Sequence, residues 1–180
     1  MKHPVLASAF LLVGLSGLTA CNTAHQSPDV SDSIKNSLQQ SGLKDVSVSQ
    51  DRDKGVVTLG GTVASDTEKA QAESIAKSYA AGQVVADQIA VRPPGQESMM
   101  KSVDSDHDSA IDKNFHAVLV QNKLTHDVKY DVKNGVVTLT GTVNSPGRRV
   151  AAQKLAESVP DVKQVVNELD VKGQKATSSN

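Results

Sequence analysis

The spacing of apolar residues early in the polar part of the chain predicts an amphipathic helix. Val30, Ile34 and Leu38 recur every four residues and therefore fall on one face of a helix. Asp29 or Ser31 stands at the start of this pattern and can cap the helix N-terminus. Such a helix must pack its apolar face against another element.

A period of two follows and predicts a pair of strands. Residues 46–48 alternate apolar and polar, and residues 56–63 form a second run rich in valine. Lys54 and Gly55 lie between the two runs and predict the turn of a hairpin. Gly61 lies late in the second strand, where a glycine marks a bulge or a close approach of backbones.

A second helix and a last strand complete the pattern. Ser65 and Glu68 have the spacing of a capping box, in which each side chain accepts a hydrogen bond from the backbone at the helix start. Residues 85–91 predict the last strand. The helix that begins after Ser65 has an apolar face formed by Ala72, Ile75, Ala76 and Tyr79. The small alanine side chains let this helix lie close to a sheet.

The whole pattern occurs twice. Residues 55–65 read GVVTLGGTVAS and residues 135–145 read GVVTLTGTVNS, with nine of eleven positions identical at an offset of 80. Upstream of the hairpin the offset becomes 82, because the first copy has two extra residues around positions 51–54. Two copies predict two small domains rather than a solenoid, which needs three or more repeats.

The second copy carries the same signals. Asn134-Gly135 is a favourable hairpin turn, and Gly141 again lies late in the strand. Ser145-Pro146 places a capping residue before a proline in the first helical turn. The apolar positions of its elements, in chain order, are Ile111, Phe115, Val118 and Leu119; Val128, Tyr130 and Val132; Ala152, Leu155, Ala156 and Val159; and Val165 to Val171.

Each unit therefore consists of helix, strand, strand, helix and strand, and the predicted fold class is α+β. Two helices on one face of a three-stranded sheet bury this pattern most economically. We expect the two domains at residues 29–91 and 108–172. The segment 92–107, which opens with Arg-Pro-Pro-Gly, predicts a polar linker, and residues 173–180 predict a disordered tail.

The order of elements and the hairpin sequence resemble the BON domain. The resemblance rests on the Gly-Val-Val-Thr-Leu-x-Gly-x-Val hairpin and on a last-strand motif, which the second copy carries as Val162, Val165, Asn167 and Leu169. The first copy matches that motif less closely. In all, about 125 residues are covered.

Two BON copies behind a signal are similar to the osmotically inducible periplasmic proteins, and with a lipidation site they are similar to dual-BON outer-membrane lipoproteins. The resemblance implies a protein without enzymatic activity, associated with phospholipid binding and envelope integrity. The matching motif residues, which include Gly55, Gly61, Gly135 and Gly141, are core and turn positions and imply no binding site.

The N-terminus predicts export. Lys2 gives a positive start, and residues 5–18 carry no charge. This apolar stretch is shorter than the roughly 20 residues that a membrane span requires, so it suits a signal peptide at residues 1–20.

The end of this signal resembles the lipobox of bacterial lipoproteins, since Leu18-Thr19-Ala20 precede Cys21. In that family the cysteine receives acyl chains such as palmitate and becomes the N-terminus, and residues 21–28 would form the tether. An ordinary signal peptide beside an incidental cysteine is the alternative. Asn22 in place of Asp favours the periplasmic face of the outer membrane under the enteric sorting rule.

Composition excludes several classes of function. The formal net charge is −1, and the chain has only two Tyr, two Phe and no Trp, so neither bulk charge nor base stacking favours nucleic-acid binding. A single cysteine excludes an intramolecular disulfide framework and a cysteine-based zinc site.

Few residues suggest a metal site or catalysis. The sequence Asp104-x-Asp106-x-Asp108 begins like a calcium loop, but its sixth position is Ser rather than Gly and its twelfth is Phe rather than Glu. It reads better as an acidic, solvated linker. The three histidines within residues 107–126 lack the spacing of a ligand pair, and no Gly-x-Ser-x-Gly sequence occurs. We expect no metal, no cofactor and no enzymatic activity.

Charge differs between the two copies. The first domain has six basic and nine acidic residues, a net charge of −3, whereas the second has nine and eight, a net charge of +1. Arg148 and Arg149 fall in the first turn of a helix, where positive charge opposes the helix dipole, and the first copy has Glu68 at the position of Arg148. We therefore take this pair as a candidate contact for phospholipid. A second candidate basic face, on the first helix of that domain, consists of Lys113, His116 and Lys123.

Two functions remain open. The first is an outer-membrane lipoprotein, anchored through Cys21, whose second domain contacts anionic phospholipid head groups and supports envelope integrity or stress tolerance. The alternative is a protein-interaction module of envelope assembly or stress response, with an envelope protein as partner and lipid contact through the acyl chains alone.

Overall fold

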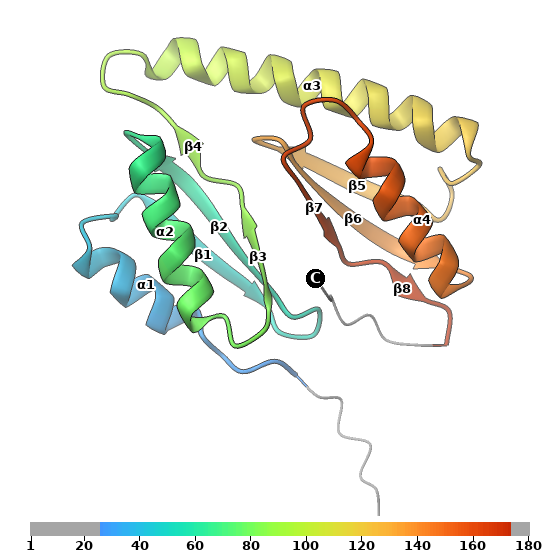
Figure 1. The fold of residues 1–180 in the computed structure, drawn as a ribbon, viewed down its shortest axis with the longest axis horizontal. Helices are drawn as coiled ribbons and strands as arrows, with labels where there is room; N and C mark the ends of the chain where they lie inside the picture. The colour runs from blue at the N-terminus through green and yellow to red at the C-terminus, as the bar shows by residue number, and fades with distance from the viewer. Residues whose placement is uncertain (1–25, 174–180) are drawn as a thin grey trace, which may run out of the picture.

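The computed structural model describes residues 26–173, which form two domains of the same design (Figure 1). The predicted signal peptide, Cys21 and residues 174–180 of the tail lie outside the described residues. The first domain contains α1 (Ser31–Gln40), β1 (Val46–Asp51), β2 (Val56–Val63), α2 (Asp66–Tyr79), β3 (Val84–Asp87) and β4 (Ala90–Val91). The second contains α3 (Glu97–Gln121), β5 (Val128–Lys133), β6 (Val136–Val143), α4 (Pro146–Glu157), β7 (Gln164–Asn167) and β8 (Asp170–Val171).

Each domain is built on a mixed sheet. β1 and β2 form an antiparallel hairpin, and β3 and β4 pair in parallel with successive parts of β2. β5 to β8 repeat this topology. The predicted α+β class and element order are confirmed. The predicted third strand, however, is interrupted at residues 88–89 and again at 168–169, so that each sheet has four short strands.

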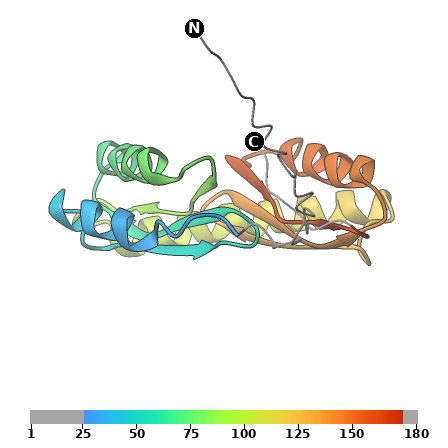
Figure 2. The ribbon, with the colours of Figure 1, turned by 90° about the horizontal axis from the view of Figure 1, so that it is seen from below.

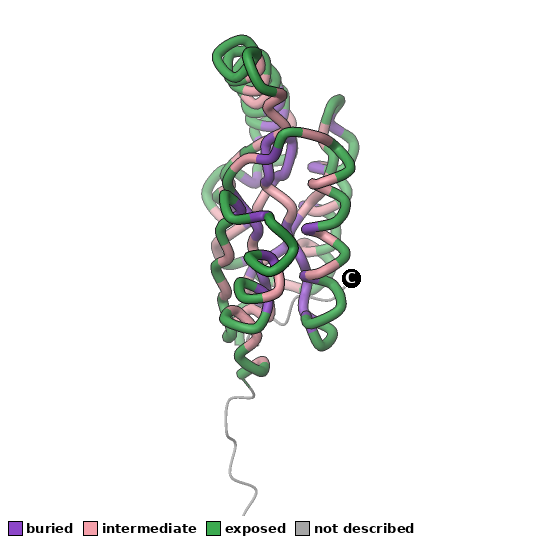
Figure 3. Tube along the Cα trace, turned by 90° about the vertical axis from the view of Figure 1, so that its left-hand side faces the viewer, coloured by how far each residue is buried: buried purple, intermediate pink, exposed green. Residues whose placement is uncertain are grey.

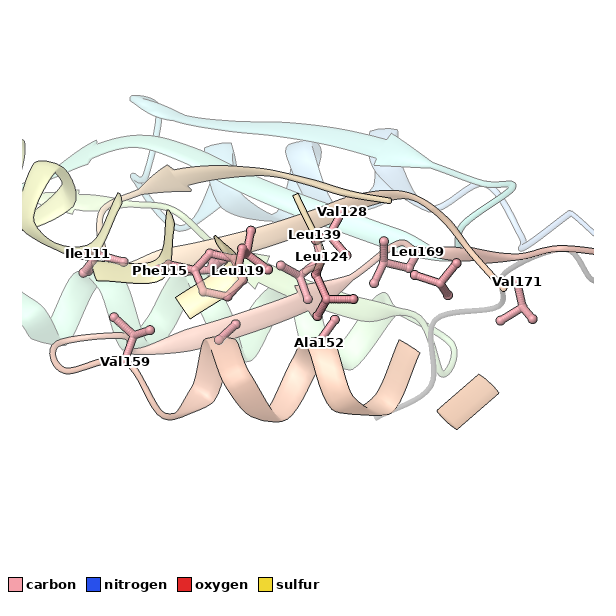
Figure 4. Packing of buried hydrophobic residues seen from close by; sticks show 13 residues of the cluster. Ile111, Phe115, Leu119, Leu124, Val128, Leu139, Ala152, Val159, Leu169 and Val171 are labelled. Carbon is pink, nitrogen blue, oxygen red and sulfur yellow. The ribbon is translucent and has the colours of Figure 1, made fainter. Parts of the chain in front are cut away.

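The helices of each domain lie against one layer of strands and enclose its core (Figure 2). Ala72 and Ala76 of α2 are fully buried, because small side chains allow the helix to approach the sheet. In the second domain Phe115 fills the space between α3, α4 and the sheet (Figure 4), with its ring edge-on to Tyr130 at a centroid distance of 4.8 Å. Seen end-on, the buried segments lie in the middle of the molecule and the exposed segments on its outside (Figure 3).

The two hairpin turns differ in length, as the change of offset predicts. Only Asn134 and Gly135 connect β5 to β6, and both have positive φ angles, 51° and 82°, as a type I′ turn requires. Four residues, 52–55, connect β1 to β2, and Gly55 has a φ of 66°. The two extra residues of the first copy therefore lie in its turn.

The late-strand glycines are positions of close backbone approach, as predicted. Gly141 has a φ of 115°, and a Cβ atom there would lie 2.4 Å from the carbonyl oxygen of Asp127. Gly61 has a φ of 92°, and a Cβ atom there would lie 2.0 Å from the carbonyl oxygen of Asp45. In both domains the residue before the first strand continues the pairing, since Thr62 N–H donates to the carbonyl of Asp45 and Thr142 N–H to that of Asp127.

The predicted caps of α2 and α4 are present. The hydroxyl of Ser65 accepts the N–H of Glu68, and the Glu68 carboxylate accepts the N–H of Ala64. Ser145 accepts the N–H of Arg148 in the same way, with proline at the first helical position.

The prediction that Asp29 or Ser31 caps α1 is wrong. The N-cap is Val30, whose N–H donates to the side-chain oxygen of Gln50 over 3.1 Å. The carboxylate of Asp29 instead accepts hydrogen bonds from the N–H and the hydroxyl of Ser31. Gln50 on β1 thus satisfies the N–H of the N-cap residue, a long-range contact that the local sequence does not reveal.

The main departure from the sequence prediction lies between the domains. The sequence predicts a polar linker at residues 92–107, whereas the structure extends the first helix of the second domain back to Glu97, so that α3 is continuous over 25 residues. This helix runs along one edge of the molecule past both domains (Figure 1). Only residues 92–96 connect it to β4.

Two acidic residues of the Asp104-x-Asp106-x-Asp108 sequence lie on the inner side of α3 and have partners in the protein. The carboxylate of Asp108 accepts the N–H groups of Asn134 and Gly135, over 2.8 and 2.9 Å, and so holds the second hairpin turn. A carboxylate oxygen of Asp104 lies 3.7 Å from the guanidinium of Arg92. The expectation of an acidic, solvated linker is therefore wrong for both residues.

The domains meet on the sheet face that the helices leave uncovered. Side chains along a strand alternate between the two faces of the sheet. Val57 and Val85 belong to the core beneath the helices, so the residues directly before and after them point to the opposite face. Five of these neighbours form one apolar cluster across the domains and are at most 7% exposed. They are Val56, Val84 and Ala86 of the first domain and Val136 and Val166 of the second.

Polar contacts surround this cluster. The side-chain amide of Gln164 accepts the N–H of Asp87 over 3.1 Å and donates to the carbonyl of Val85 over 2.7 Å, so it satisfies the edge of β3 as a neighbouring strand would. The tip of each hairpin also reaches the other domain, at the break between β3 and β4 in one case and at β8 in the other. Asn134 donates to the carbonyl of Gln88 over 2.6 Å, and Lys54 donates to Asp170 over 2.6 Å. We call these contacts and the apolar cluster the domain junction.

Gly141→Ala should destabilise the protein by about 3 kcal/mol, because the new Cβ atom meets a backbone carbonyl and φ is positive. For a chain of this size the midpoint of thermal unfolding should fall by about 10 °C. Gly147→Ala is the matched control, since its nearest neighbour is a side-chain oxygen 3.9 Å away. Equal losses from both variants, measured by circular dichroism, would contradict the assigned role of Gly141.

Glu168→Gln should make the protein more stable at pH 7. Burial at the junction raises the pKa of Glu168, nearby Asp51 adds to this effect, and Lys54 only partly opposes it. Stability contributed by the protonated form is complete below the ordinary glutamate pKa of 4.5 and is lost as the pH rises through the higher folded value. The gain should therefore be present in melting at pH 7 and absent at pH 4. Asp131→Asn, which removes one exposed carboxylate charge, is the matched control and should leave the stability at pH 7 close to that of the wild type.

Candidate functional site

The arginine pair predicted as a phospholipid contact is divided by the structure. Arg148 and Arg149 both lie in the first turn of α4, but their guanidinium groups contact different parts of the domain. Each group binds an oxygen within the domain.

Arg148 forms an ion pair with Asp127, which lies in the loop between α3 and β5. Their nitrogen and oxygen atoms are 2.7 Å apart, and the side chains are 43% and 30% exposed. In the first domain the same position is Glu68, whose carboxylate caps α2. The carboxylate of Asp127 therefore supplies the negative charge that the N-terminus of α4 otherwise lacks.

Arg149 supports the corner between β7 and β8. Its guanidinium donates to the carbonyl of Asn167 over 3.1 Å. The buried amide of Asn167 donates in turn to the carbonyl of Arg149 and to Gln153, and its oxygen accepts the N–H of Leu169. Arg149 thus contributes to a hydrogen-bonded corner rather than to an open cationic surface.

The first domain has a related corner with a different chemistry. Lys69 donates to the carbonyl of Ile89 over 2.7 Å, and its Nζ atom lies 3.7 Å from the carboxylate of Asp87. Burial raises the pKa of Asp87, and the N–H of Ile89 and the charge of Lys69 oppose that rise. A cation from the second helix therefore supports the corner in both repeats.

The other three predicted residues are exposed. Lys113 and His116, three residues apart, lie on the outer side of α3, whereas Lys123 follows the end of the helix and has a φ of 55°. Their side chains form no hydrogen bond or ion pair within residues 26–173. The prediction that all three lie on the helix is wrong for Lys123.

Two further cations were not among the sequence candidates. Lys129 and Lys133 lie on β5 with exposed side chains, and they alternate with the buried or half-buried Val128, Tyr130 and Val132. They therefore point to the sheet face away from the helices. The alternation of lysine with apolar residues was the available signal.

The acidic residues and the histidine that line one cavity of the described residues do not form a metal-binding group. One cavity of about 320 Å³ lies between α3, the second hairpin turn and the loop before β7, and its walls include Asp104, His107 and Asp108. Both carboxylates already bind protein groups. Within residues 26–173 there is no group of three or more acidic, histidine or cysteine residues that could hold a metal ion. No described helix combines the length and hydropathy of a membrane span.

Comparison with known proteins identifies the repeat. The family model of the BON domain matches residues 27–93 and 107–173, which together form most of the chain. The chain belongs to the BON-domain family. The matched segments begin and end close to the two structural repeats, and we refer to them as BON1 and BON2.

Several proteins are similar to this chain. Osmotically-inducible protein Y of Escherichia coli (strain K12) is 31% identical over 137 residues, which cover 75% of this chain and 67% of that protein. An uncharacterized protein encoded in the gshII 5′ region of Anaplasma centrale is 37% identical over 70 residues, 39% of this chain and 46% of that protein. Among solved structures, the C-terminal domain of CdsD, a structural protein of the type III secretion system of Chlamydia trachomatis, is 14% identical, covers 81% of this chain and 98% of that domain, and has a TM-score of 0.34.

The two BON domains differ in charge at equivalent surface positions. The buried residues Ile34 and Leu38 of BON1 correspond to Phe115 and Leu119 of BON2, which sets an offset of 81 for the first helices. The offset for the first strands is 82. Lys113, His116, Lys123, Lys129 and Lys133 of BON2 correspond to Asp32, Lys35, Gly42, Ser47 and Asp51 of BON1. Four of these positions are lysine in BON2 and neutral or acidic in BON1, whereas His116 corresponds to Lys35, so only the four lysines distinguish BON2 from BON1.

Arg148→Glu should destabilise BON2, because it places a carboxylate opposite Asp127. The expected loss is about 1 kcal/mol, or a few degrees in the unfolding midpoint. Arg148→Glu/Asp127→Lys should recover most of that loss by restoring opposite charges. If the double variant is no more stable than the single one in thermal unfolding, the ion pair does not have the role described.

Proposed function

We propose that this protein is an envelope lipoprotein, anchored through Cys21, whose BON2 domain contacts anionic phospholipid at the membrane surface. The observation that carries the proposal is a set of four exposed lysines in BON2, Lys113, Lys123, Lys129 and Lys133, at positions where BON1 has neutral or acidic residues. The lipobox-like sequence before Cys21 supports the anchor.

Hydrogen bonds attach the first described residues to BON1. They therefore limit how far BON1 can lie from a membrane anchor at Cys21. Ser27 and Arg52 exchange hydrogen bonds of 2.9 and 2.8 Å, and the amides of Gln50 and Gln83 both donate to the carbonyl of Pro28. Five residue steps separate Cys21 from Gln26 and span at most roughly 18 Å. An acylated Cys21 would therefore hold BON1 close to the bilayer.

Anchoring also allows a weak head-group contact to be effective. A lysine near an anionic membrane contributes about 1 kcal/mol, which is too little to recruit a soluble protein alone. A protein already confined to the surface meets the head groups at high effective concentration. Lys113, His116 and Lys123 are the proposed contacts, together with Lys129 and Lys133. Arg148 and Arg149 have less to contribute, since their charges are engaged within BON2.

The name of the Escherichia coli relative records osmotic induction. Osmotic stress acts on the envelope, so a role in envelope integrity or stress tolerance agrees with a surface that contacts phospholipid. We propose this role for the present protein as well.

Lys123→Glu/Lys129→Glu should weaken binding to anionic vesicles at least tenfold, because two favourable charges become unfavourable. The assay is cosedimentation of residues 22–180, without acyl chains, with phosphatidylglycerol-containing vesicles and with neutral phosphatidylcholine vesicles, at low and high salt. Wild-type binding should require the anionic lipid and should weaken in high salt.

Lys35→Glu/Lys44→Glu is the matched control, since it makes the same change of charge on exposed positions of BON1. It should alter binding less than twofold. Equal losses from both double variants would mean that net charge, and not the BON2 surface, governs binding. If the wild type ignores anionic vesicles at low salt, the lipid proposal fails and a protein-interaction module becomes the better account.

A further inference from the structure

The outer side of α3 carries a regular stripe of exposed residues. Met99, Val103 and Val120 are 67%, 39% and 53% exposed, and they are three of the five large hydrophobic residues exposed within residues 26–173. Successive members of the stripe are four and three residues apart in alternation, the spacing by which helices pack on helices. The members of this outer stripe are Met99, Val103, Asp106, Ala110, Lys113, Ala117 and Val120.

The outer stripe lies almost opposite the side of α3 that packs on the protein. The buried side contains Ile111, Phe115 and Leu119. At 100° per residue, every stripe residue lies at least about 120° around the helix from Phe115, the middle of the buried side. Because α3 forms one edge of the molecule, this side faces away from both domains (Figures 1 and 3).

The order of residues along the stripe is self-complementary. Read outward from Ala110, Asp106 on one side matches Lys113 on the other, Val103 matches Ala117, and Met99 matches Val120. An antiparallel copy of the same helix, related by a twofold axis at Ala110, would therefore set each Asp106 against a Lys113. The small side chain at the axis permits a close approach of the two helices.

We propose that this face binds a second copy of the chain, with the two α3 helices packed antiparallel about Ala110. The twofold arrangement pairs apolar ends with apolar ends and forms two Asp106–Lys113 contacts, a closed, isologous interface. The positions that flank the stripe include no Asp, Glu, Lys or Arg; they are Met100, Ser102, His107, Ser109, Asn114, His116 and Gln121. Neither Asp106 nor Lys113 has a side-chain hydrogen bond or an ion pair within residues 26–173.

The stripe contains two alanines and few large side chains, so the dimer is weak in solution. Attachment of both copies to one membrane would raise their effective concentration and favour it. The pairing itself does not depend on the proposed lipid contact. In the dimer Lys113 is opposite a carboxylate, which leaves Lys123, Lys129 and Lys133 as the cations available to phospholipid.

Disulfide trapping tests the geometry. Residues 22–180 contain no cysteine, so Ala110→Cys introduces a single thiol. At about 0.1 mM protein, in the range where weak interfaces are populated, mild oxidation should convert most of this variant to a covalent dimer. Ser105→Cys, exposed on the same helix but off the stripe, is the matched control and should cross-link at least fivefold more slowly. Equal rates would show random collision and overturn the proposal, as would a lack of cross-linking at position 110.

Charge reversal tests whether Asp106 of one copy lies opposite Lys113 of the other. In the Ala110→Cys background, Asp106→Lys and Lys113→Asp should each slow cross-linking about tenfold, because each places like charges opposite one another twice. The double reversal restores opposite charges at unchanged net charge, and the rate should return to within twofold of the parent. Failure of the double variant to recover would overturn the antiparallel register. Neither cross-linking experiment measures vesicle binding by residues 22–180. Failure of the lipid proposal would therefore be detected separately from failure of the dimer proposal.

Discussion

The burial of five small apolar side chains on the uncovered sheet faces holds the two BON domains together. A valine removed from water contributes roughly 1.5 kcal/mol or more, and the cluster includes Val56, Val136 and Val166 at 1% exposure. The cluster alone would allow several arrangements, since hydrophobic contact has no direction. Gln164 adds direction, because its amide matches one N–H and one carbonyl on the edge of β3. The domains are consequently parts of one body and not beads on a linker.

This union determines which surfaces can serve a function. It occupies the inner strand edges and the sheet faces nearest to them, and it leaves the outer side of α3 and the outer strand β5 open. The two repeats have kept their core residues and their close-approach glycines and have diverged at these open surfaces. Lys129 stands where BON1 has Ser47, and Lys133 where it has Asp51. One of the two repeats thus carries lysines at exposed positions where the other has a neutral or an acidic residue.

The sequence alone predicted those structural features that depend on residues close together along the chain. The turn at Asn134-Gly135 and the cap at Ser145 depend on neighbouring residues, and both were predictable. The first half of α3 was not, because its inner residues Asp104 and Asp108 look like solvent-exposed charges until their partners are known. Arg148 looked unsatisfied for the same reason, since Asp127 lies 21 residues away. The junction valines follow the same pattern as core valines, and no local signal separates them.

Residual dipolar couplings of backbone amides, measured on residues 22–180 in a dilute aligning medium, test most directly whether BON1 and BON2 form one body. The domain junction predicts that couplings from β1–β4 and from β5–β8 fit a single alignment tensor with the orientation of the structure. Two different tensors, with a smaller amplitude for one domain, would show that the domains move independently. In that case the junction, and the surfaces that it leaves exposed, would have to be abandoned as the basis of function.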